Sequence, residues 1–213
     1  MGRQQSGFTL VEMAVVLVII GLLLGGVLKG QELINSAKAK SLVNDFRATA
    51  TFVYGYQDRF RALPGDDAAA DTHIGGTKAT TGGTVGNGRI DGDWNSTTVT
   101  DESVLFWQHV RLANLTSGTT AAPTAETITG WLPRNAEGGR IGITSAAPIT
   151  GMSGSFFVCQ GSLSGRFARQ IDTTMDDGIS DTGTVQLAVD GETDAAANAS
   201  VTDTGIYTVC VAY

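Results

Sequence analysis

One apolar segment near the N-terminus limits what this chain of 213 residues can fold into. It covers residues 8–28 and is interrupted by a single carboxylate, that of Glu12. As a helix rising about 1.5 Å per residue it would be about 32 Å long, enough to cross a hydrocarbon core of about 30 Å. The segment therefore predicts a membrane-spanning helix with an ionisable group inside it.

Glu12 would lie within the hydrocarbon region. An unpaired carboxylate there costs at least about 3 kcal/mol, so it needs a partner or stays protonated. A free N-terminal amine of a neighbouring chain is a partner that the sequence can supply. The alternative is an ordinary single-pass anchor in which the Glu12 side chain reaches back toward the membrane interface.

The residues before the apolar segment are few and polar. Residues 1–6 include one basic residue, Arg3, and the pair Gly7 and Phe8 precedes the apolar run. A secretory signal peptide has its apolar region before the cleavage site, whereas cleavage here would leave the membrane segment on the mature protein. Over residues 1–35 the chain resembles a type IV prepilin or a type II secretion pseudopilin.

The resemblance implies a fold and a set of processing residues. A membrane peptidase would cut after Gly7 and methylate the new amine of Phe8, and Glu12 would act in assembly. The short leader is similar to that of type IVa pilins. Many pilins have a proline in this helix, where the present chain has glycines, so any kink should centre on Gly25 and Gly26. The implied fold is α+β, a long N-terminal helix packed on a C-terminal antiparallel sheet.

Three regions are expected from this interpretation. Residues 1–7 form a cleaved leader, residues 8–35 a transmembrane and filament-core half of the helix, and residues 36–213 a periplasmic or extracellular head. The head includes the amphipathic half of the helix, where apolar residues recur at spacings of three and four. Leu63, Pro64 and Gly65 are expected to stop this helix.

The rest of the head is predicted to combine loops, two short helices and a sheet. Residues 65–100 and 116–130 are rich in Gly and Thr and predict surface loops. Helices are expected after Thr100 and around residues 167–175, and His109 on the first of them should be a half-buried packing residue. Runs of β-branched and aromatic residues predict strands at 140–144, 155–159, 185–189 and 206–211.

The head contains the only two cysteines, Cys159 and Cys210. Beyond the membrane such a pair is expected to form a disulfide. Closing a loop of about 50 residues would stabilise the head by about 4 kcal/mol in the chain-entropy model. Type IV pilins are similar in this respect, since a disulfide commonly ties their C-terminal segment to the sheet.

Acidic residues gather in several loops of the head. Calcium takes six to eight oxygen ligands from flexible loops, so such groups are candidate calcium sites. The set put forward as a metal site is Asp172, Asp176, Asp177 and Asp181. The alternative is solvated turn carboxylates, because Asp-Gly pairs are typical of turns. Neither this set nor residues 87–93 reproduces the EF-hand loop, and no other cofactor is expected.

Composition and motifs argue against two classes of function. The formal net charge is −7 and the basic residues are dispersed, with Lys38 and Lys40 the nearest approach to a cluster, so nucleic acid is not expected as the primary ligand. Residues 161–165 place Leu163, not a serine, at the centre of a would-be nucleophile elbow. The chain is therefore not expected to be an enzyme.

The expected function is that of a structural subunit of a type IV pilus, as a major or minor pilin, serving adhesion, motility or DNA uptake. Its expected partners are prepilin peptidase, an inner-membrane assembly platform and other pilin subunits. It would span the inner membrane of a bacterium once and then lie in a surface pilus or a periplasmic pseudopilus. The alternatives are a type II secretion pseudopilin and a minor pilin whose head binds a surface; the disulfide and the head size favour a pilin over the smaller, cysteine-poor major pseudopilin.

Overall fold

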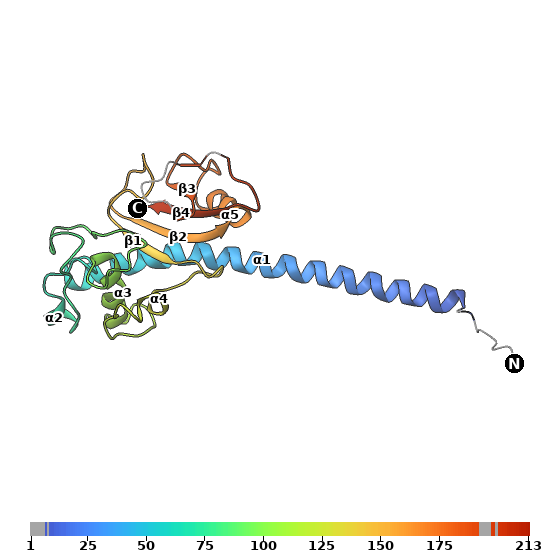
Figure 1. Cartoon of the computed structure of the whole chain (residues 1–213), viewed down its shortest axis with the longest axis horizontal. Helices are drawn as coiled ribbons and strands as arrows, with labels where there is room; N and C mark the ends of the chain where they lie inside the picture. The colour runs from blue at the N-terminus through green and yellow to red at the C-terminus, as the bar shows by residue number, and fades with distance from the viewer. Residues whose placement is uncertain (1–6, 8, 192–196, 199) are drawn as a thin grey trace. The chain divides into compact units, whose positions relative to one another are not determined.

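The computed structural model describes residues 7, 9–191, 197–198 and 200–213. The chain forms two compact units, Met1–Lys38 and Ala39–Tyr213, and one helix, α1 (Leu10–Phe60), runs through both. The arrangement of elements is α+β: the long apolar N-terminal helix packs in its C-terminal half against an antiparallel sheet (Figure 1).

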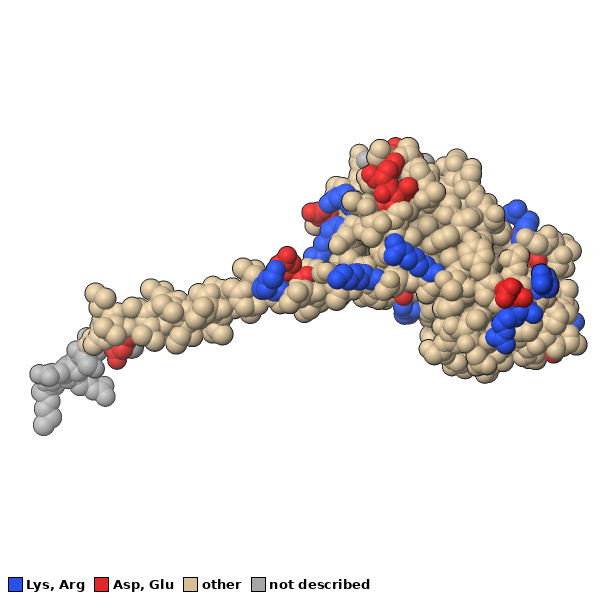
Figure 2. All heavy atoms as spheres, turned by 180° about the vertical axis from the view of Figure 1, so that it is seen from behind, with Lys and Arg blue, Asp and Glu red and all other residues tan. Residues whose placement is uncertain are grey.

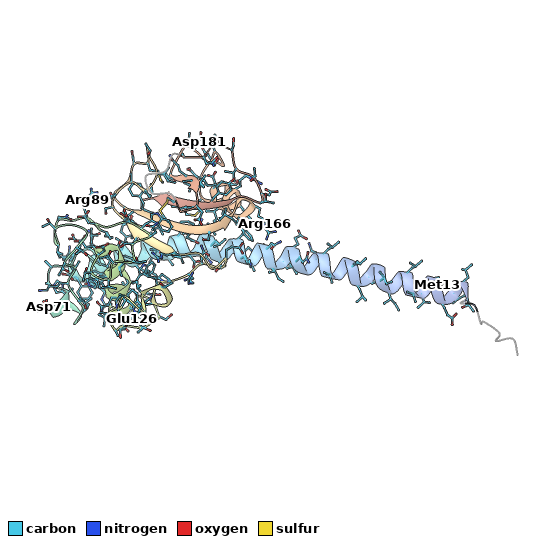
Figure 3. All side chains as sticks on the ribbon, viewed as in Figure 1. Met13, Asp71, Arg89, Glu126, Arg166 and Asp181 are labelled. Atoms are coloured by element: carbon cyan, nitrogen blue, oxygen red, sulfur yellow. A yellow bond between two sulfur atoms is a disulfide. The ribbon has the colours of Figure 1, made fainter. Side chains whose placement is uncertain are left out.

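In the first unit, α1 is exposed on every side. Its large apolar residues between positions 10 and 28 are 46–86 % exposed. Side chains project all around the helix, as near the labelled Met13 in Figure 3, and few of them are charged (Figure 2). Among the described residues α1 is the one helix long and apolar enough to cross a membrane. The helix continues without interruption through Gly25 and Gly26, where the sequence places any kink.

In the second unit, residues 39–60 of α1 present one apolar stripe to the head. Its buried members recur at helical spacing, as the sequence predicts: Leu42, Phe46, Ala50, Val53 and Tyr56. The helix ends at Phe60, and Arg61 follows with a φ of 57°. This end lies three residues before Leu63, where the predicted Leu-Pro-Gly stop begins.

The sheet has the strand order β1-β2-β4-β3, and all neighbours are antiparallel. Its strands are β1 (Ile141–Thr144), β2 (Phe157–Ser164), β3 (Val185–Val189) and β4 (Ile206–Ala212). The β2–β4 register shifts between Gln160 and Leu163, and Ser162 in this bulge has a φ of 57°. Gln160 also ties the sheet to α1, because its Nε2 donates a 2.9 Å hydrogen bond to the carbonyl oxygen of Leu42.

Both faces of the sheet are covered. The inner face packs against α1, α3 (Glu102–Leu112) and α5 (Gly165–Met175) in one apolar core that includes Phe46, Phe106 and Phe167. A second, smaller cluster covers the outer face, where Trp94, Ile149 and Met152 contact the middle of β2 and β4. The sheet is therefore buried on both sides although it is antiparallel.

The segment at residues 65–100 is irregular and largely exposed apart from one short helix, as the prediction of a surface loop requires, but it also packs several side chains into the head. It contains a short helix, α2 (Ala70–His73), and buries both Ile90 and Trp94. Asp66 is itself buried, and its carboxylate accepts hydrogen bonds from the amides of residues 86–88. This carboxylate folds the segment back on itself, because the side chain satisfies three backbone donors that the loop would otherwise expose.

Helix α3 begins where the sequence predicts but is buried more completely. Residues 102–111 are all buried, and His109 is fully buried rather than half-buried. The Nδ1 atom of His109 accepts a 2.9 Å hydrogen bond from the amide of Gly65, so Nε2 carries the proton and donates to the carbonyl oxygen of Thr77 at 2.8 Å. A further short helix, α4 (Ile128–Trp131), lies in the second segment that was expected to be a loop.

Candidate functional site

The start of α1 carries a reciprocal hydrogen-bond pair between Thr9 and Glu12. One carboxylate oxygen of Glu12 accepts hydrogen bonds from the backbone amide and the hydroxyl of Thr9, both at 2.8 Å. The hydroxyl of Thr9 in turn accepts a 3.3 Å hydrogen bond from the amide of Glu12. This is a capping box, which satisfies amides that the first helical turn leaves without a partner.

The capping box changes how the charge of Glu12 is accommodated. Within a single chain the carboxylate already has two donors, and it lies at the partly positive N-terminus of a helix. A neighbouring amine is therefore not needed to prevent an unpaired anion. An assembly partner would add to these hydrogen bonds or compete with them.

The other processing residues lie at the limit of the described chain. Gly7 is exposed, whereas Phe8 and residues 1–6 lie outside the described residues. The expected cleavage point therefore lies at the limit of the described residues, and only Gly7 on its N-terminal side is described. Cleavage, methylation and the leader boundary stay predictions.

The two cysteines are joined. Cys159 on β2 and Cys210 on β4 stand directly opposite each other in the antiparallel register and form a disulfide with a sequence separation of 51. Both are fully buried on the outer face of the sheet, under Trp94 and Met152. The disulfide therefore fixes the last strand to the centre of the sheet.

Three of the four acidic residues proposed for a metal come together. One carboxylate oxygen from each of Asp172, Asp176 and Asp177 lies within 4.8 Å of the others. Asp172 is fully buried near the end of α5, Asp176 is half-buried and Asp177 is exposed. Asp181 is exposed and is not part of this group; Figure 3 labels it at the outer side of the head.

Sequence reasoning did not find a hydrogen-bond network at the end of α1, in which Tyr56 and Asp67 are buried and His73 is exposed. The Asp67 carboxylate accepts a 2.7 Å hydrogen bond from the Tyr56 hydroxyl and contacts Nδ1 of His73 at 2.7 Å. The His73 ring stacks on Phe60 with centroids 5.5 Å apart. These residues adjoin a cleft lined by residues from the end of α1 and the start of the following segment, together with Gly86 and Gly88.

The network links segments far apart in sequence. The hydrogen bonds to its neighbours hold the pKa of the Asp67 carboxyl below its ordinary value, although burial opposes them. Burial raises the pKa of Tyr56, and the hydrogen bond to the same carboxylate and its charge add to the rise. The network therefore ties the start of the 65–100 segment to the last turns of α1, and we assign it a structural role.

Comparison with known proteins bears on the N-terminal segment. Residues 2–28 match the family described as the prokaryotic N-terminal methylation motif, the leader signature of type IV pilins and pseudopilins. No curated protein and no solved structure matches the chain significantly. The matched residues include the expected cleavage point and the capping box.

Proposed function

We propose that a chain opening with this methylation motif is a structural subunit of a type IV pilus, as a major or minor pilin. The motif over residues 2–28 is the observation that carries the proposal, and by itself it supports a pilin or a pseudopilin. In the proposed pathway, prepilin peptidase cuts between Gly7 and Phe8 and methylates the new amine. Subunits then assemble from the inner membrane.

The exposed first half of α1 supports this pathway. Large apolar side chains cover all sides of the helix over residues 10–28. Such a surface is unstable in water and must be covered by lipid or by protein. A membrane helix before assembly, and a packed bundle of the same helices in a filament, would cover it in turn.

The disulfide of the head suits a protein that persists outside the cytoplasm, whether in a pilus or in a pseudopilus, so the place where the head is found separates the two. We expect antibody against the head to label filaments sheared from the cell surface. Labelling confined to the periplasm of intact cells would contradict the pilus assignment and favour a pseudopilin.

Glu12 offers a test of how subunits join. Glu12→Gln keeps an oxygen acceptor at the third helical position, which a capping box accepts, but removes the negative charge. Thr9→Val keeps the charge and removes the hydroxyl of the cap. If the carboxylate pairs with a neighbouring amine, the glutamine variant should lose most of its filaments and the valine variant should lose far fewer.

The comparison needs a control and a measure of insertion. Glu32→Gln neutralises another carboxylate of α1, which is ion-paired with Lys29 on an exposed turn, and should assemble normally. Immunoblots of membranes should show equal amounts of all variants, since removing the charge makes the segment more apolar. A Glu12→Gln strain that keeps its filaments would show that the charge of Glu12 is not needed and that Glu12 acts only as a cap.

A further inference from the structure

We propose that the end of α5 and the turn leading to β3 form a binding site for one hard divalent cation of the calcium type, held by Asp172, Asp176 and Asp177. The proposal goes beyond the role of a filament subunit, which requires no cation. It rests on the buried carboxylate of Asp172, which has no hydrogen-bond partner among the described residues, and on its acidic neighbours Asp176 and Asp177. It rests also on the position of all three at the C-terminal end of α5.

The buried carboxylate of Asp172 is the feature of this group that most needs an explanation. Its side chain is fully buried, and neither carboxylate oxygen accepts a hydrogen bond of normal geometry from the described residues. Buried carboxylates are normally hydrogen-bonded, paired or bound to metal.

Other buried acids of the head show what is missing at Asp172. The Asp66 carboxylate accepts three backbone amides, and the Asp67 carboxylate has three donors, including the Tyr56 hydroxyl. Asp172 has no comparable set. None of the Lys, Arg or His side chains in the described ranges forms an ion pair with Asp172 or its acidic neighbours.

The two neighbouring carboxylates are held by local hydrogen bonds that leave one oxygen of each open. Asp176 accepts the amides of Thr184 and Val185 on Oδ2, at 2.6 and 3.0 Å. Asp177 accepts the amide of Ile179 on Oδ1 at 2.9 Å. The second oxygen of each accepts no hydrogen bond from the part of the chain that the structure describes. Both carboxylates are therefore fixed in place while retaining a free ligand atom.

The position on the helix makes a bound cation favourable. The three carboxylates lie at the C-terminal end of α5, where the last backbone carbonyls give a partial negative charge. Anions are disfavoured at such an end, and three of them within 4.8 Å repel one another. A divalent cation would remove both penalties.

The donor set is that of a hard ion. Both oxygens of Asp172 and one oxygen each of Asp176 and Asp177 can supply up to four ligands, and backbone carbonyls or water would complete the six to eight that calcium takes. The set contains no nitrogen or sulfur donor of the kind that zinc or copper prefers. Such an ion would also link the end of α5 to the start of β3, because Asp176 already holds the amides of Thr184 and Val185.

Calcium binding to the full-length chain in detergent micelles tests the proposal. Titration calorimetry and the melting temperature with calcium or with a chelator would be measured for the wild type and for Asp172→Asn. We expect the wild type to bind one calcium ion and to melt about 5–10 °C higher at a calcium concentration 100-fold above its Kd. Asp172→Asn should bind at least tenfold more weakly and should show no such shift.

Two further variants complete the design. Asp181→Asn, in the same loop but outside the group, should bind and melt like the wild type. Asp177→Asn changes an exposed ligand, so its weaker binding would not reflect misfolding of a buried site. Wild-type protein without any calcium response at millimolar concentration, or a response that Asp172→Asn retains in full, would overturn the proposal and leave the filament assignment untouched.

Discussion

Glu102 should make the head less stable as the pH rises. It is the first residue of α3 and is fully buried; its Oε2 accepts a 2.7 Å hydrogen bond from the amide of Asp91. Its Oε1 has no partner among the described residues. Burial raises the pKa of this carboxyl from 4.5 to about 7; the Asp91 amide opposes the rise, and the charges of Asp66, Asp91 and Asp101 add to it.

The sign of the effect follows from the raised pKa. The folded state binds the proton more tightly than the unfolded state, so Glu102 contributes most to stability below about pH 4.5. That contribution is lost as the pH rises through about 7. At about 1.4 kcal/mol per pH unit, the upper limit of the loss is about 3 kcal/mol. The partly positive N-terminal end of α3 stabilises the ionised form of Glu102, so we expect the loss of stability to be about 2 kcal/mol rather than the upper limit.

Glu102→Gln tests this reasoning because glutamine keeps the acceptor for Asp91 and cannot ionise. At pH 8 the free energy of unfolding of the variant should be about 2 kcal/mol higher than that of the wild type, which corresponds to a melting temperature about 4–8 °C higher. At pH 4 the two should be equal. The measurement is thermal and urea unfolding of the detergent-solubilised full chain from pH 4 to 8.

The control is Glu126→Gln, an exposed glutamate whose substitution should leave the wild-type pH profile unchanged. The reasoning about Glu102 is refuted if Glu102→Gln is no more stable than the wild type at pH 8. It is equally refuted if the gain is the same at pH 4, because a neutral acid and an amide differ little there.

Three other expectations can be checked with the same protein. Cys210→Ser should lower the free energy of unfolding by about 4 kcal/mol, because the lost cross-link spans 51 residues; an unchanged urea midpoint would contradict this. Gly65→Ala should cost more than about 1 kcal/mol, since Gly65 has a φ of 92° and an added Cβ would clash with a backbone carbonyl, whereas Gly130→Ala in an open position should not destabilise. Burial lowers the pKa of His109 from 6.5, so NMR should find its ring mostly neutral at pH 6.5, with the proton on Nε2; a mostly charged ring at that pH would contradict the hydrogen bonds.

The parts of the fold that could be predicted from the sequence are those with local signals. Alternation and β-branching place all four strands within a few residues of their observed bounds, although β2 runs on to Ser164. The N-terminal segment is equally local, because leader, junction, carboxylate and apolar run are contiguous. Helix α5 likewise follows from apolar residues at a spacing of four.

What the sequence could not predict depends on distant partners. The carboxylate of Asp66 binds amides about 20 residues further along, so nothing near it in the sequence distinguishes it from a solvated turn residue. The same holds for His109, whose hydrogen bonds hold two points of the 65–100 segment, Gly65 and Thr77, against α3. The burial of these groups is decided by packing between segments rather than by composition.

The capping box is a different case, because the sequence pattern that predicts it is present at the start of the helix. Thr9 and Glu12 have the Thr-x-x-Glu spacing at the start of an apolar helix. Reasoning from the cost of a charge in the membrane directed attention to a partner in another chain. The structure shows that an intrachain partner, three residues away, is available first.

The intact mass of the chain recovered from filaments sheared off the cell surface tests the central claim most directly. We predict the mass of residues 8–213 with one disulfide and one added methyl group, and fragmentation that places the methyl group on the amine of Phe8. Recovery of this species would join processing and assembly in one observation. A chain that retains Met1, or one that never enters the filament fraction although it is processed, would contradict the assignment as a pilus subunit.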